Sequence, residues 1–378
     1  MSKGKKRIVI VGGGFAGLAA AKRLRRYHSR FEITLLDKRQ TSDFLPLVPD
    51  VISGKVGESR TRYSLTSFAS ENGCDFVCTK AEDIDAARQV VKTHTGAFPY
   101  DYLVLACGTQ TTFFNREEIS SKAYVLDSTA DAVKLREEAA KGDFRTAVVV
   151  GGGYTGVETA THLRRLFKRQ KENKRIVIVE LGSQILSQVP AGFRAYTLAN
   201  LKNMSIEVKT QTTVQDMEGG TVMLTDGTTI EEAVLVWEPG VAAPKLADTL
   251  GVEQGAQRRV KVDPYLQASQ RCFVAGDSAL PMDETNVPLR LSVQFALQEG
   301  ACAADNIVRR EEQRPLRALR PLDLGYVIPM ANNRSAGKAL GIPVYGVAAT
   351  SLHYFMCMLR AQGSETRWGV FRDLCSHR

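Results

Sequence analysis

The chain has 378 residues, of which 44% are hydrophobic, and its 50 Lys and Arg against 41 Asp and Glu give a formal net charge of +9. This length and apolar content allow two or three domains with large buried cores and exclude a small peptide or a disordered chain. The positive charge favours anionic partners such as nucleotides or a phospholipid surface. No apolar stretch reaches the roughly 18 to 20 residues of a membrane span, so we expect neither a spanning helix nor a secretory signal.

The cysteines and histidines are scattered along the chain. The seven cysteines include no CxxC pair and no dense spacing, which indicates a reducing, cytoplasmic setting. None of the five histidines stands at zinc-type spacing from a cysteine or carboxylate. We therefore expect no metal site.

The first motif is a glycine-rich turn near the N-terminus. A strand ending in GxGxxG, a helical pattern and a second strand follow one another over Arg7–Gly17, 18–26 and Glu32–Asp37. Gly12 allows the tight turn, Gly14 lets the backbone approach a pyrophosphate, and Gly17 lets the helix pack on the strand. Asp37 ends the second strand, where a carboxylate is placed to bind a ribose diol. This combination predicts a dinucleotide site.

The same arrangement returns in the middle of the chain. Its strand, helical pattern and second strand cover Thr146–Gly156, Val157–Phe167 and Arg175–Glu180. The turn glycines are Gly151, Gly153 and Gly156, and Glu180 ends the second strand. Two such units in one chain predict two dinucleotides. No arginine follows Glu180 closely enough to receive a 2′-phosphate, which favours NADH over NADPH.

Two further strands end in turns of small residues. Tyr102–Thr109 is a buried strand running into Gly108, and Arg271–Asp277 is a strand ending in Gly276 and Asp277. The first turn allows close passage of the backbone, and the second offers a carboxylate to a sugar-like hydroxyl. Each is also typical of an ordinary strand-to-loop turn. Following the first glycine motif in this order, they indicate one nucleotide site.

With these segments the sequence resembles the two-dinucleotide-domain flavoproteins of the pyridine nucleotide-disulfide oxidoreductase superfamily. Within them it resembles the type II NADH dehydrogenases, which are single-subunit NADH:quinone oxidoreductases, over nearly the whole chain. The narrower matches are Phe44–Val48 with Ser53–Gly54, Val236–Trp237 with Gly240–Val241, Val260–Leu266 and Gln294–Gly300. The last is similar to the AQxAxQxG helix that borders the flavin and the quinone entrance in the family.

The chain departs from the family pattern at three places. Val293 replaces the usual alanine before Gln294, and Pro343 stands at about the place where some relatives carry a lysine near the acceptor pocket. The loop Trp237–Gly240 lacks the small residues common there. These departures leave the electron acceptor less defined than the donor.

The resemblance implies an α/β fold with two Rossmann-like dinucleotide-binding domains, for FAD and NAD, and a C-terminal membrane-associating region. We expect the FAD-binding domain in 1–115 and 257–313 and the NAD(H)-binding domain in 116–256. Residues 314–378 are expected to form a hairpin and an amphipathic membrane-anchoring region. The hairpin strands, the apolar segment and the arginines facing lipid headgroups are Leu324–Ile328, Ala339–Tyr345, Val347–Arg360, and Arg360, Arg367, Arg372 and Arg378. Docking of this segment on the protein itself or on a partner chain is the alternative.

The resemblance also implies the site residues. Those expected to bind FAD or NADH are Gly12, Gly14, Phe15, Ala16, Gly17, Asp37, Lys38, Pro46, Ala81, Ala106, Gly108, Thr109, Gly151, Gly153, Tyr154, Thr155, Gly156, Glu180, Gly240, Gly276, Asp277, Val293 and Gln294. The expected catalytic residues are Glu158, Gln294 and Gln298. Glu158 takes part in hydride or proton handling or is only a helix-start acid. The two glutamines bind a quinone carbonyl or flavin oxygen or only hold neighbouring backbone.

The implied activity is transfer of hydride from NADH to FAD and of two electrons on to a membrane quinone, without proton pumping. We expect it on the cytoplasmic side of the cell membrane, with no nucleic-acid partner, and a homodimer stays open. A disulfide reductase would need a redox cysteine pair, and residues 41–54 and 146–256 contain no cysteine. Cys302, one helical turn beyond Gln298, keeps a sulfide:quinone reductase open. Also open are an NADH-dependent reductase of a soluble ferredoxin or rubredoxin and a redox-responsive binding module resembling apoptosis-inducing factor.

Overall fold

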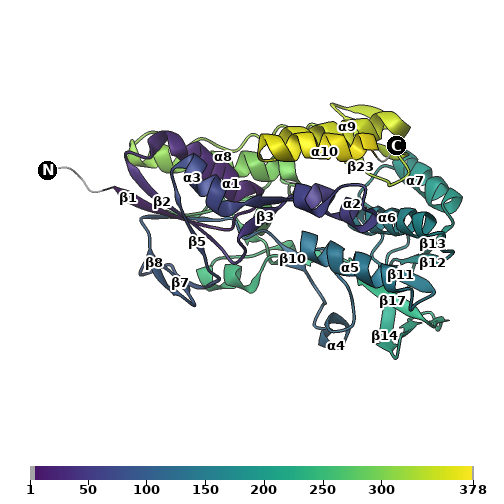
Figure 1. Cartoon of the computed structure of the whole chain (residues 1–378). Coiled ribbons are helices and arrows are strands. Elements are labelled where there is room, and N and C mark those ends of the chain that lie inside the picture. The colour runs from purple at the N-terminus through teal and green to yellow at the C-terminus, as the bar shows by residue number, and fades with distance from the viewer. Residues whose placement is uncertain (1–4, 377–378) are drawn as a thin grey trace. The chain divides into compact units, whose positions relative to one another are not determined.

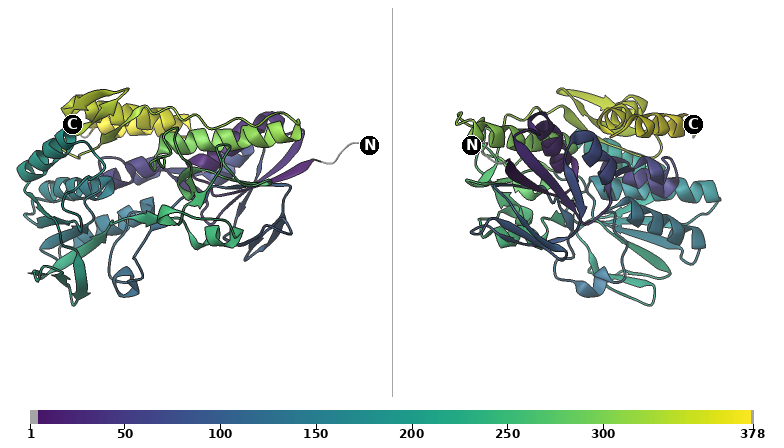
Figure 2. Two further views of the ribbon diagram at one scale, coloured as in Figure 1. Left: turned by 180° about the vertical axis from the view of Figure 1, so that it is seen from behind. Right: turned by 60° about the vertical axis from the view of Figure 1, so that its left-hand side comes forward.

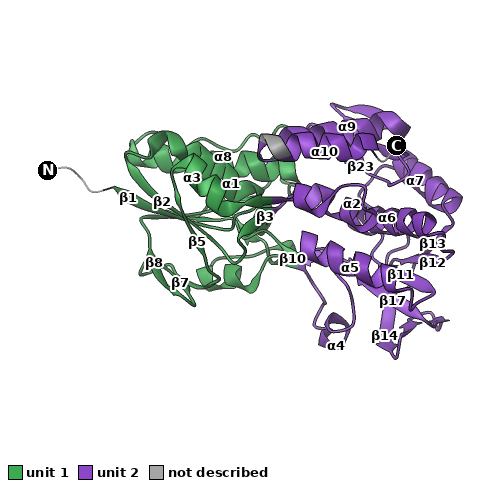
Figure 3. Cartoon of the chain, viewed as in Figure 1, with its two compact units in different colours: residues 1–42, 63–110, 242–323 green, residues 43–62, 111–241, 324–378 purple. Residues whose placement is uncertain are grey.

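The computed structural model describes residues 5–376, except for the side chains of Ser364 and Glu365. The chain folds into two compact units, each assembled from segments that are distant in the sequence (Figures 1 and 3). Unit 1 comprises Met1–Ser42, Tyr63–Gln110 and Ala242–Asp323. Unit 2 comprises Asp43–Arg62, Thr111–Val241 and Leu324–Arg378.

Unit 1 is built on a six-stranded sheet in the order β20-β21-β9-β1-β2-β5. β1 pairs in parallel with β2 on one side and with β9 on the other, so the order in which the chain adds strands to the sheet reverses at β1. Its strands are β1 (Lys6–Val11), β2 (Phe31–Asp37), β5 (Asp75–Cys78), β9 (Tyr102–Leu105), β20 (Gln267–Ser269) and β21 (Cys272–Val274). Helices α1 (Phe15–Leu24) and α8 (Val293–Glu311) pack against each other and share a buried hydrophobic core with these strands.

Smaller elements complete unit 1. They are η1 (Arg25–Tyr27), α3 (Leu65–Asn72), the antiparallel strands β6 (Ala81–Asp85), β7 (Val90–Thr93) and β8 (Gly96–Pro99), η4 (Lys245–Leu250), η5 (Ala256–Arg258), the paired strands β19 (Val260–Lys261) and β22 (Ala279–Leu280), and η6 (Gly276–Ser278). The chain crosses between the units near β3 (Thr41–Asp43), β4 (Arg62–Ser64), β10 (Gln110–Thr111) and β18 (Val241–Ala242).

Unit 2 is built on a four-stranded parallel sheet in the order β13-β12-β11-β17. Its strands are β11 (Thr146–Val150), β12 (Arg175–Val179), β13 (Ile206–Lys209) and β17 (Ala233–Trp237). Every residue of β11 is buried, as expected for a parallel strand covered on both faces. The other elements are η2 (Leu45–Leu47), α2 (Val48–Ser53), η3 (Glu58–Arg60), α4 (Glu117–Ser120), α5 (Thr129–Lys141), α6 (Tyr154–Gln170), α7 (Ala191–Asn203), β14 (Val214–Glu218), β15 (Thr221–Leu224) and β16 (Thr229–Ile230).

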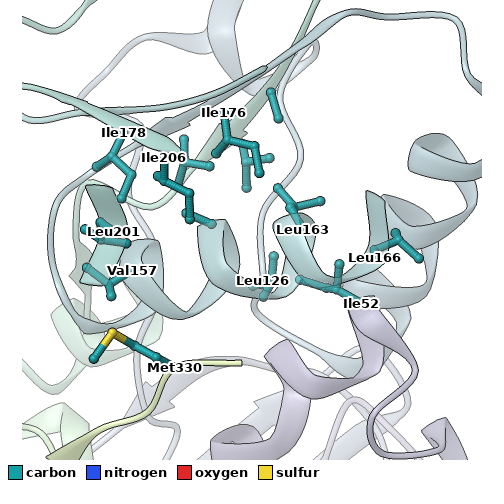
Figure 4. Close-up of a cluster of buried hydrophobic side chains, with 14 of the residues drawn as sticks. Ile52, Leu126, Val157, Leu163, Leu166, Ile176, Ile178, Leu201, Ile206 and Met330 are labelled. Carbon is teal, nitrogen blue, oxygen red and sulfur yellow. The ribbon is translucent and has the colours of Figure 1, made fainter. Parts of the chain in front are cut away.

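The main core of unit 2 joins this sheet to helix α6 and to segments from both ends of the chain. Figure 4 shows Ile176 and Ile178 of β12 in one cluster with Leu163 of α6, and Ile52 of α2 and Met330 at the edges of this cluster. Apolar side chains that are far apart in the sequence therefore hold α2 and the C-terminal segment on the unit 2 sheet.

The C-terminal segment forms a three-stranded antiparallel sheet followed by two helices, which lie side by side (Figure 2). These elements are β23 (Gly325–Ile328), β24 (Ser335–Ala339), β25 (Ile342–Tyr345), α9 (Gly346–Arg360) and α10 (Ser364–Ser376). The predicted hairpin was wrong, because β23 pairs with β24 and the expected second strand is interrupted by a turn at Leu340 and Gly341. β24 was missed because Ser-Ala-Gly-Lys-Ala lacks alternating large apolar residues. No described helix has the length and apolarity needed to cross a membrane.

The unit boundaries differ from the predicted domain boundaries at four places, one of which is the short segment 111–115, which belongs to unit 2. Residues 43–62 fold with unit 2 because α2 packs on α5 and α6. Residues 242–256 fold with unit 1 because η4 packs against β6. Residues 314–323 also belong to unit 1, since the backbone of Leu322 is hydrogen-bonded to Gln298. The nucleotide that each unit binds stays a prediction at this point.

Candidate functional site

The first glycine turn joins β1 to α1 in unit 1. Gly12 has a φ of +111°, and a Cβ there would overlap the carbonyl oxygen of Ala106. A Cβ at Gly17 would overlap the carbonyl oxygen of Gly12, so helix and strand meet at backbone distance. A Cβ at Gly14 would meet no atom within 4 Å. This space lies at the N-terminus of α1, where free N–H groups and the helix dipole favour a pyrophosphate.

Asp37 holds the end of β2 against this turn. Its Oδ2 accepts a hydrogen bond of 2.7 Å from the N–H of Gly13, and its Oδ1 accepts one of 2.8 Å from the N–H of Arg39. The carboxylate therefore lies beside the turn, where the predicted ribose would be bound. Of the other expected FAD residues in unit 1, Ala16 and Ala106 are buried, Phe15, Ala81, Gly108 and Thr109 are half-buried, and Lys38 is exposed.

The second glycine turn, in unit 2, repeats this geometry between β11 and α6. Gly151 has a φ of +101°, and a Cβ there would overlap the carbonyl oxygen of Glu238. A Cβ at Gly153 would again meet no atom within 4 Å. Glu180 accepts hydrogen bonds of 2.7 Å from the N–H groups of Gly152 and Gly182. The two turns thus present the same open space, and a carboxylate is bonded to each.

The remaining residues expected to contact a nucleotide in unit 2 lie in two places. Tyr154, Thr155 and Gly240 are half-buried, the first two on the opening turn of α6 and the third just after β17. Pro46 is half-buried in η2 of unit 2, although the sequence analysis assigned it to the FAD-binding domain. The segment Phe44–Val48 therefore folds with the second glycine turn.

A buried acid that the sequence analysis missed supports the turn at Gly276. Glu299 on α8 is 3% exposed and accepts a hydrogen bond of 2.6 Å from the N–H of Gly276. Burial raises the pKa of Glu299 to about 8, opposed by this N–H. Burial also raises the pKa of Asp277, and the positive charge of Arg259 opposes that rise. The only sequence signal for Glu299 was its place inside the Gln294–Gly300 motif.

The two glutamines of α8 are bonded to the chain that follows it. Gln294 is 6% exposed and donates to Oδ1 of Asp323 at 3.0 Å. Gln298 donates to the carbonyl oxygens of Gln294 and Leu322 and accepts from the N–H of Leu322 at 2.8 Å. These hydrogen bonds agree with the expectation that the two glutamines hold neighbouring backbone. Val293 opens the helix and is half-buried, and the roles of all three toward a flavin or quinone stay predictions.

Glu158 lies on the first turns of α6, two residues beyond the last turn glycine. The residue is half-buried, and desolvation of its carboxyl, together with the negative charge of Asp50, raises its pKa well above the usual range. A raised pKa favours the protonated form of the carboxyl. The part of Glu158 in hydride or proton handling stays a prediction.

All seven cysteines are free. Burial raises the pKa of Cys302 to about 11, so this thiol is protonated at neutral pH and is a poor nucleophile. Within residues 5–376 no group of three or more potential metal ligands comes together. None of the cysteines, which all lie within the described residues, forms a disulfide in this structure.

Comparisons with known proteins give the family and the fold. Residues 6–300 match the model of the pyridine nucleotide-disulphide oxidoreductase family. Demethylphylloquinone reductase NdbB of Synechocystis sp. is 28% identical over 368 residues, covering 92% of this chain and 90% of that protein. The type II NADH:quinone oxidoreductase of Haemophilus influenzae is 24% identical over 385 residues, covering 88% and 87%.

Solved structures share the architecture. NDH2 from Plasmodium falciparum in complex with NADH superposes with a TM-score of 0.88 over 98% of each chain, at 16% identity. At this identity the likeness establishes the fold. The predicted α/β class with Rossmann-like parallel-sheet domains is confirmed by this match and by the two sheets described above.

Proposed function

The chain belongs to the pyridine nucleotide-disulphide oxidoreductase family, and we propose that it is an FAD-dependent NADH:quinone oxidoreductase. The observation that carries the proposal is the pair of matching glycine turns, each with open space at its middle glycine and a carboxylate bonded to the turn. Relatives whose names describe quinone reductases align over about nine tenths of the chain and support the choice of acceptor.

The residues of unit 1 fit the FAD. The pyrophosphate would lie over Gly14, and Asp37 would bind the ribose. Asp277, fixed by the bond between Gly276 and Glu299, offers a buried carboxyl to a further hydroxyl. When bound, FAD supplies the redox chemistry by accepting hydride and passing on two electrons.

The residues of unit 2 fit NADH better than NADPH. The pyrophosphate would lie over Gly153, with Glu180 at the adenosine ribose. Both carboxylate oxygens of Glu180 already accept backbone N–H groups, so the side chain is fixed in place. A fixed negative charge at this position repels the 2′-phosphate of NADPH.

The cysteine chemistry separates this proposal from the related activities. Disulfide reduction requires a pair of cysteines, and sulfide oxidation requires a reactive thiolate. Cys302 is the cysteine nearest to the glutamines of α8 along the chain, and its raised pKa opposes thiolate formation. A quinone, which accepts electrons without a protein thiol, is the acceptor that these residues support.

The C-terminal segment supports binding at a membrane surface. Val347, Phe355 and Leu359 are 67%, 52% and 54% exposed on α9, and their spacing of multiples of four places them on one face. The opposite face buries Tyr354 and Cys357. Further exposed apolar residues of this segment are Leu340, Ile342, Tyr345, Trp368 and Phe371.

Arginines accompany this apolar surface. Arg367 and Arg372 are exposed and Arg360 is half-buried, whereas Arg378 lies outside the described residues. Apolar side chains flanked by arginine are typical of segments that lie in the headgroup region of anionic membranes. We therefore place the enzyme at the cytoplasmic surface of the cell membrane as a peripheral protein.

The test is anaerobic stopped-flow absorbance of the purified flavoprotein. NADH should bleach the flavin faster than NADPH, and a menaquinone or ubiquinone analogue should then restore its absorbance rapidly. A protein that NADH reduces but no quinone reoxidises would contradict the proposed acceptor and favour a ferredoxin-type partner. A long-lived charge-transfer absorbance with negligible turnover would instead favour the redox-responsive binding module.

A further inference from the structure

A cluster of ionisable side chains lies in the interior of unit 2, where α2, α6 and α9 meet. Asp50 and His162 are each 1% exposed, and Tyr354 is 7% exposed. Asp50 comes from α2, His162 from α6 and Tyr354 from α9, so distant parts of the sequence contribute one residue each. We call these three residues the buried acid cluster.

Tyr354 and His162 both approach the same oxygen of Asp50. The hydroxyl of Tyr354 donates to Oδ1 of Asp50 at 2.6 Å, and Nε2 of His162 lies 3.7 Å from the same oxygen. Nδ1 of His162 is 2.8 Å from the hydroxyl of Ser53, which donates to the carbonyl oxygen of Asp50 at 3.3 Å. A neutral His162 with its proton on Nδ1 thus leaves Nε2 as an acceptor facing Asp50. At 3.7 Å this nitrogen and Oδ1 of Asp50 are too far apart for a direct hydrogen bond.

Several charged and titratable groups act on Asp50. They are Lys55 after α2, Glu158, His162 and Arg165 on α6, and Tyr354 and Cys357 on α9. Other charged or titratable groups on the surrounding helices have different partners: Arg169 on α6 donates to the carbonyl oxygen of Ser53, Arg136 on α5 pairs with Glu58, and on α9 the positive charge of Arg360 acts on His353. Lys55 is 5% exposed and donates to Oδ1 of Asn333 at 2.8 Å, with its ammonium 4.7 Å from the centre of the Tyr354 ring. The positive charges of Lys55 and Arg165 stabilise the ionised form of Asp50, although this residue is buried.

Burial alone does not explain why these residues are present. An ionisable pair in a protein interior loses its hydration, and apolar residues of similar volume are often as stabilising. Strongly perturbed acids and bases are instead typical of functional sites. Burial raises the pKa of Asp50 to about 6, opposed by Lys55 and the Tyr354 hydroxyl, and burial lowers the pKa of His162 well below its usual range. Asp50 is thus adjusted to exchange a proton near neutral pH, whereas His162 is held in its neutral form.

Helix α6 connects this cluster to the second glycine turn. Glu158 and His162 are four residues apart on α6, so their side chains point to the same helix face. Asp50 and Glu158 repel each other electrostatically, because the charge of Asp50 contributes to the raised pKa of Glu158. Ionisation of one carboxyl therefore favours protonation of the other. Among the residues of the cluster, Asp50 is the group whose charge acts on Glu158 and is therefore the source from which a proton lost by Glu158 would be replaced.

The proposed reaction consumes a proton, which the protein has to supply. Transfer of two electrons from NADH to a quinone follows NADH + H⁺ + quinone → NAD⁺ + quinol, so each turnover consumes one proton that NADH does not provide. We propose that the buried acid cluster of Asp50, His162 and Tyr354 stores this proton and passes it through Glu158 to the acceptor oxygen. The O–H bond of Glu158 breaks as the O–H bond of the quinol forms, and the cluster then reprotonates Glu158. This inference rests on the proposed function, and Asp50 and Tyr354 are positioning residues in it.

The test is the pH dependence of quinone-driven flavin reoxidation in the holoenzyme, measured with a soluble ubiquinone analogue after anaerobic reduction by NADH. In the unmodified protein the rate should fall as the pH rises through about 6, where Asp50 loses its proton. Asp50→Asn should remove this pH dependence and slow reoxidation roughly tenfold at pH 6. Tyr354→Phe removes a donor to the ionised carboxyl, so the fall should move to higher pH by about one unit.

Thr350→Val is the matched control. Thr350 is buried on α9, one turn before Tyr354, and shares a hydrogen bond of 2.7 Å with the hydroxyl of Ser335. The control loses a buried anchor of α9 without losing an ionisable group, so its pH profile should match that of the unmodified protein. An infrared titration should also show a deuterium-sensitive carboxylic acid band that Asp50→Asn removes.

The outcomes separate the two proposals. If no quinone reoxidises the unmodified protein, the proposed function fails and this inference fails with it. If reoxidation is fast but Tyr354→Phe keeps the unmodified pH profile, or Thr350→Val shifts it equally, the proton store is wrong and the proposed function stands. Because Tyr354→Phe retains a large apolar side chain, it tests the inference even if Asp50→Asn does not fold.

Discussion

The side-chain carboxyl of Glu299 accepts a buried hydrogen bond of 2.6 Å from the backbone N–H of Gly276, and this bond joins α8 to the turn carrying Asp277. The folded protein favours the protonated acid, since burial raises the pKa of Glu299 from an ordinary 4.5 to about 8. The resulting stabilisation is fully present below about pH 4.5 and is lost as the pH rises through 8.

Glu299→Gln should therefore change how stability depends on pH. Glutamine accepts the same N–H and does not titrate, so the variant should gain stability relative to the unmodified protein as the pH rises from 5 to 9. The gain should be roughly 3 kcal/mol in the free energy of unfolding, measured by denaturant unfolding of the flavin-bound protein. Glu284→Gln, at an exposed position, is the control. A difference that is constant across this pH range would contradict the prediction.

Gly14 and Gly153 each lie at the open space of one turn, so replacing either glycine by alanine should weaken the binding of one nucleotide and leave the other bound. Gly14→Ala places a methyl group where no protein atom lies within 4 Å, so the fold should persist while the FAD pyrophosphate is displaced. We expect purified Gly14→Ala to contain little flavin and to bind added FAD at least about tenfold more weakly.

Gly153→Ala is its counterpart in unit 2 and should have the opposite selectivity. The variant should retain its yellow colour, and its flavin should need at least about tenfold more NADH for half-maximal bleaching rate. Loss of FAD from Gly153→Ala, or normal FAD affinity in Gly14→Ala, would reverse the assignment of the two units.

Glu180 should determine the choice between NADH and NADPH. Glu180→Gln keeps one oxygen that accepts from Gly152 or Gly182, loses the other hydrogen bond, and removes the charge that repels a 2′-phosphate. The ratio of kcat/KM for NADH to that for NADPH should fall by roughly tenfold, which corresponds to about 1.4 kcal/mol. Steady-state kinetics with both nucleotides measures this ratio. If the ratio is unchanged, the discrimination lies elsewhere in unit 2.

The apolar face of α9 should be required for membrane binding. Phe355→Asp introduces a charge on the exposed face, away from the buried Tyr354 and Cys357, so the fold should be retained. Flotation with anionic liposomes should recover at least about fivefold less of this variant than of the unmodified protein. Val287→Asp, at an exposed position of unit 1, should float normally. Equal flotation of both variants would favour docking of α9 on a partner chain.

Local sequence patterns were sufficient to predict the two glycine turns. The sequence showed apolar strands, GxGxxG turns and terminal acids, and each of these depends on residues within about thirty positions of one another. The structure places Asp37 and Glu180 on the turns as the patterns predict, and the β1-β2 and β11-β12 pairs are parallel. The strand β24 and the turn after it were not predicted, because their pairing depends on contacts with β23 and β25 and not on local periodicity.

Only the tertiary structure decided which distant residues share an environment. Asp50 and Tyr354 are separated by most of the chain, and nothing in the local sequence of either marks a buried acid. Their burial follows from the packing of α2 and α9 within unit 2, and that packing also adjusts their proton affinities. The sequence by itself therefore determined the nucleotide-binding turns, which short-range geometry specifies. Solvent exclusion, which sets the proton chemistry, arises only when the separate segments fold together.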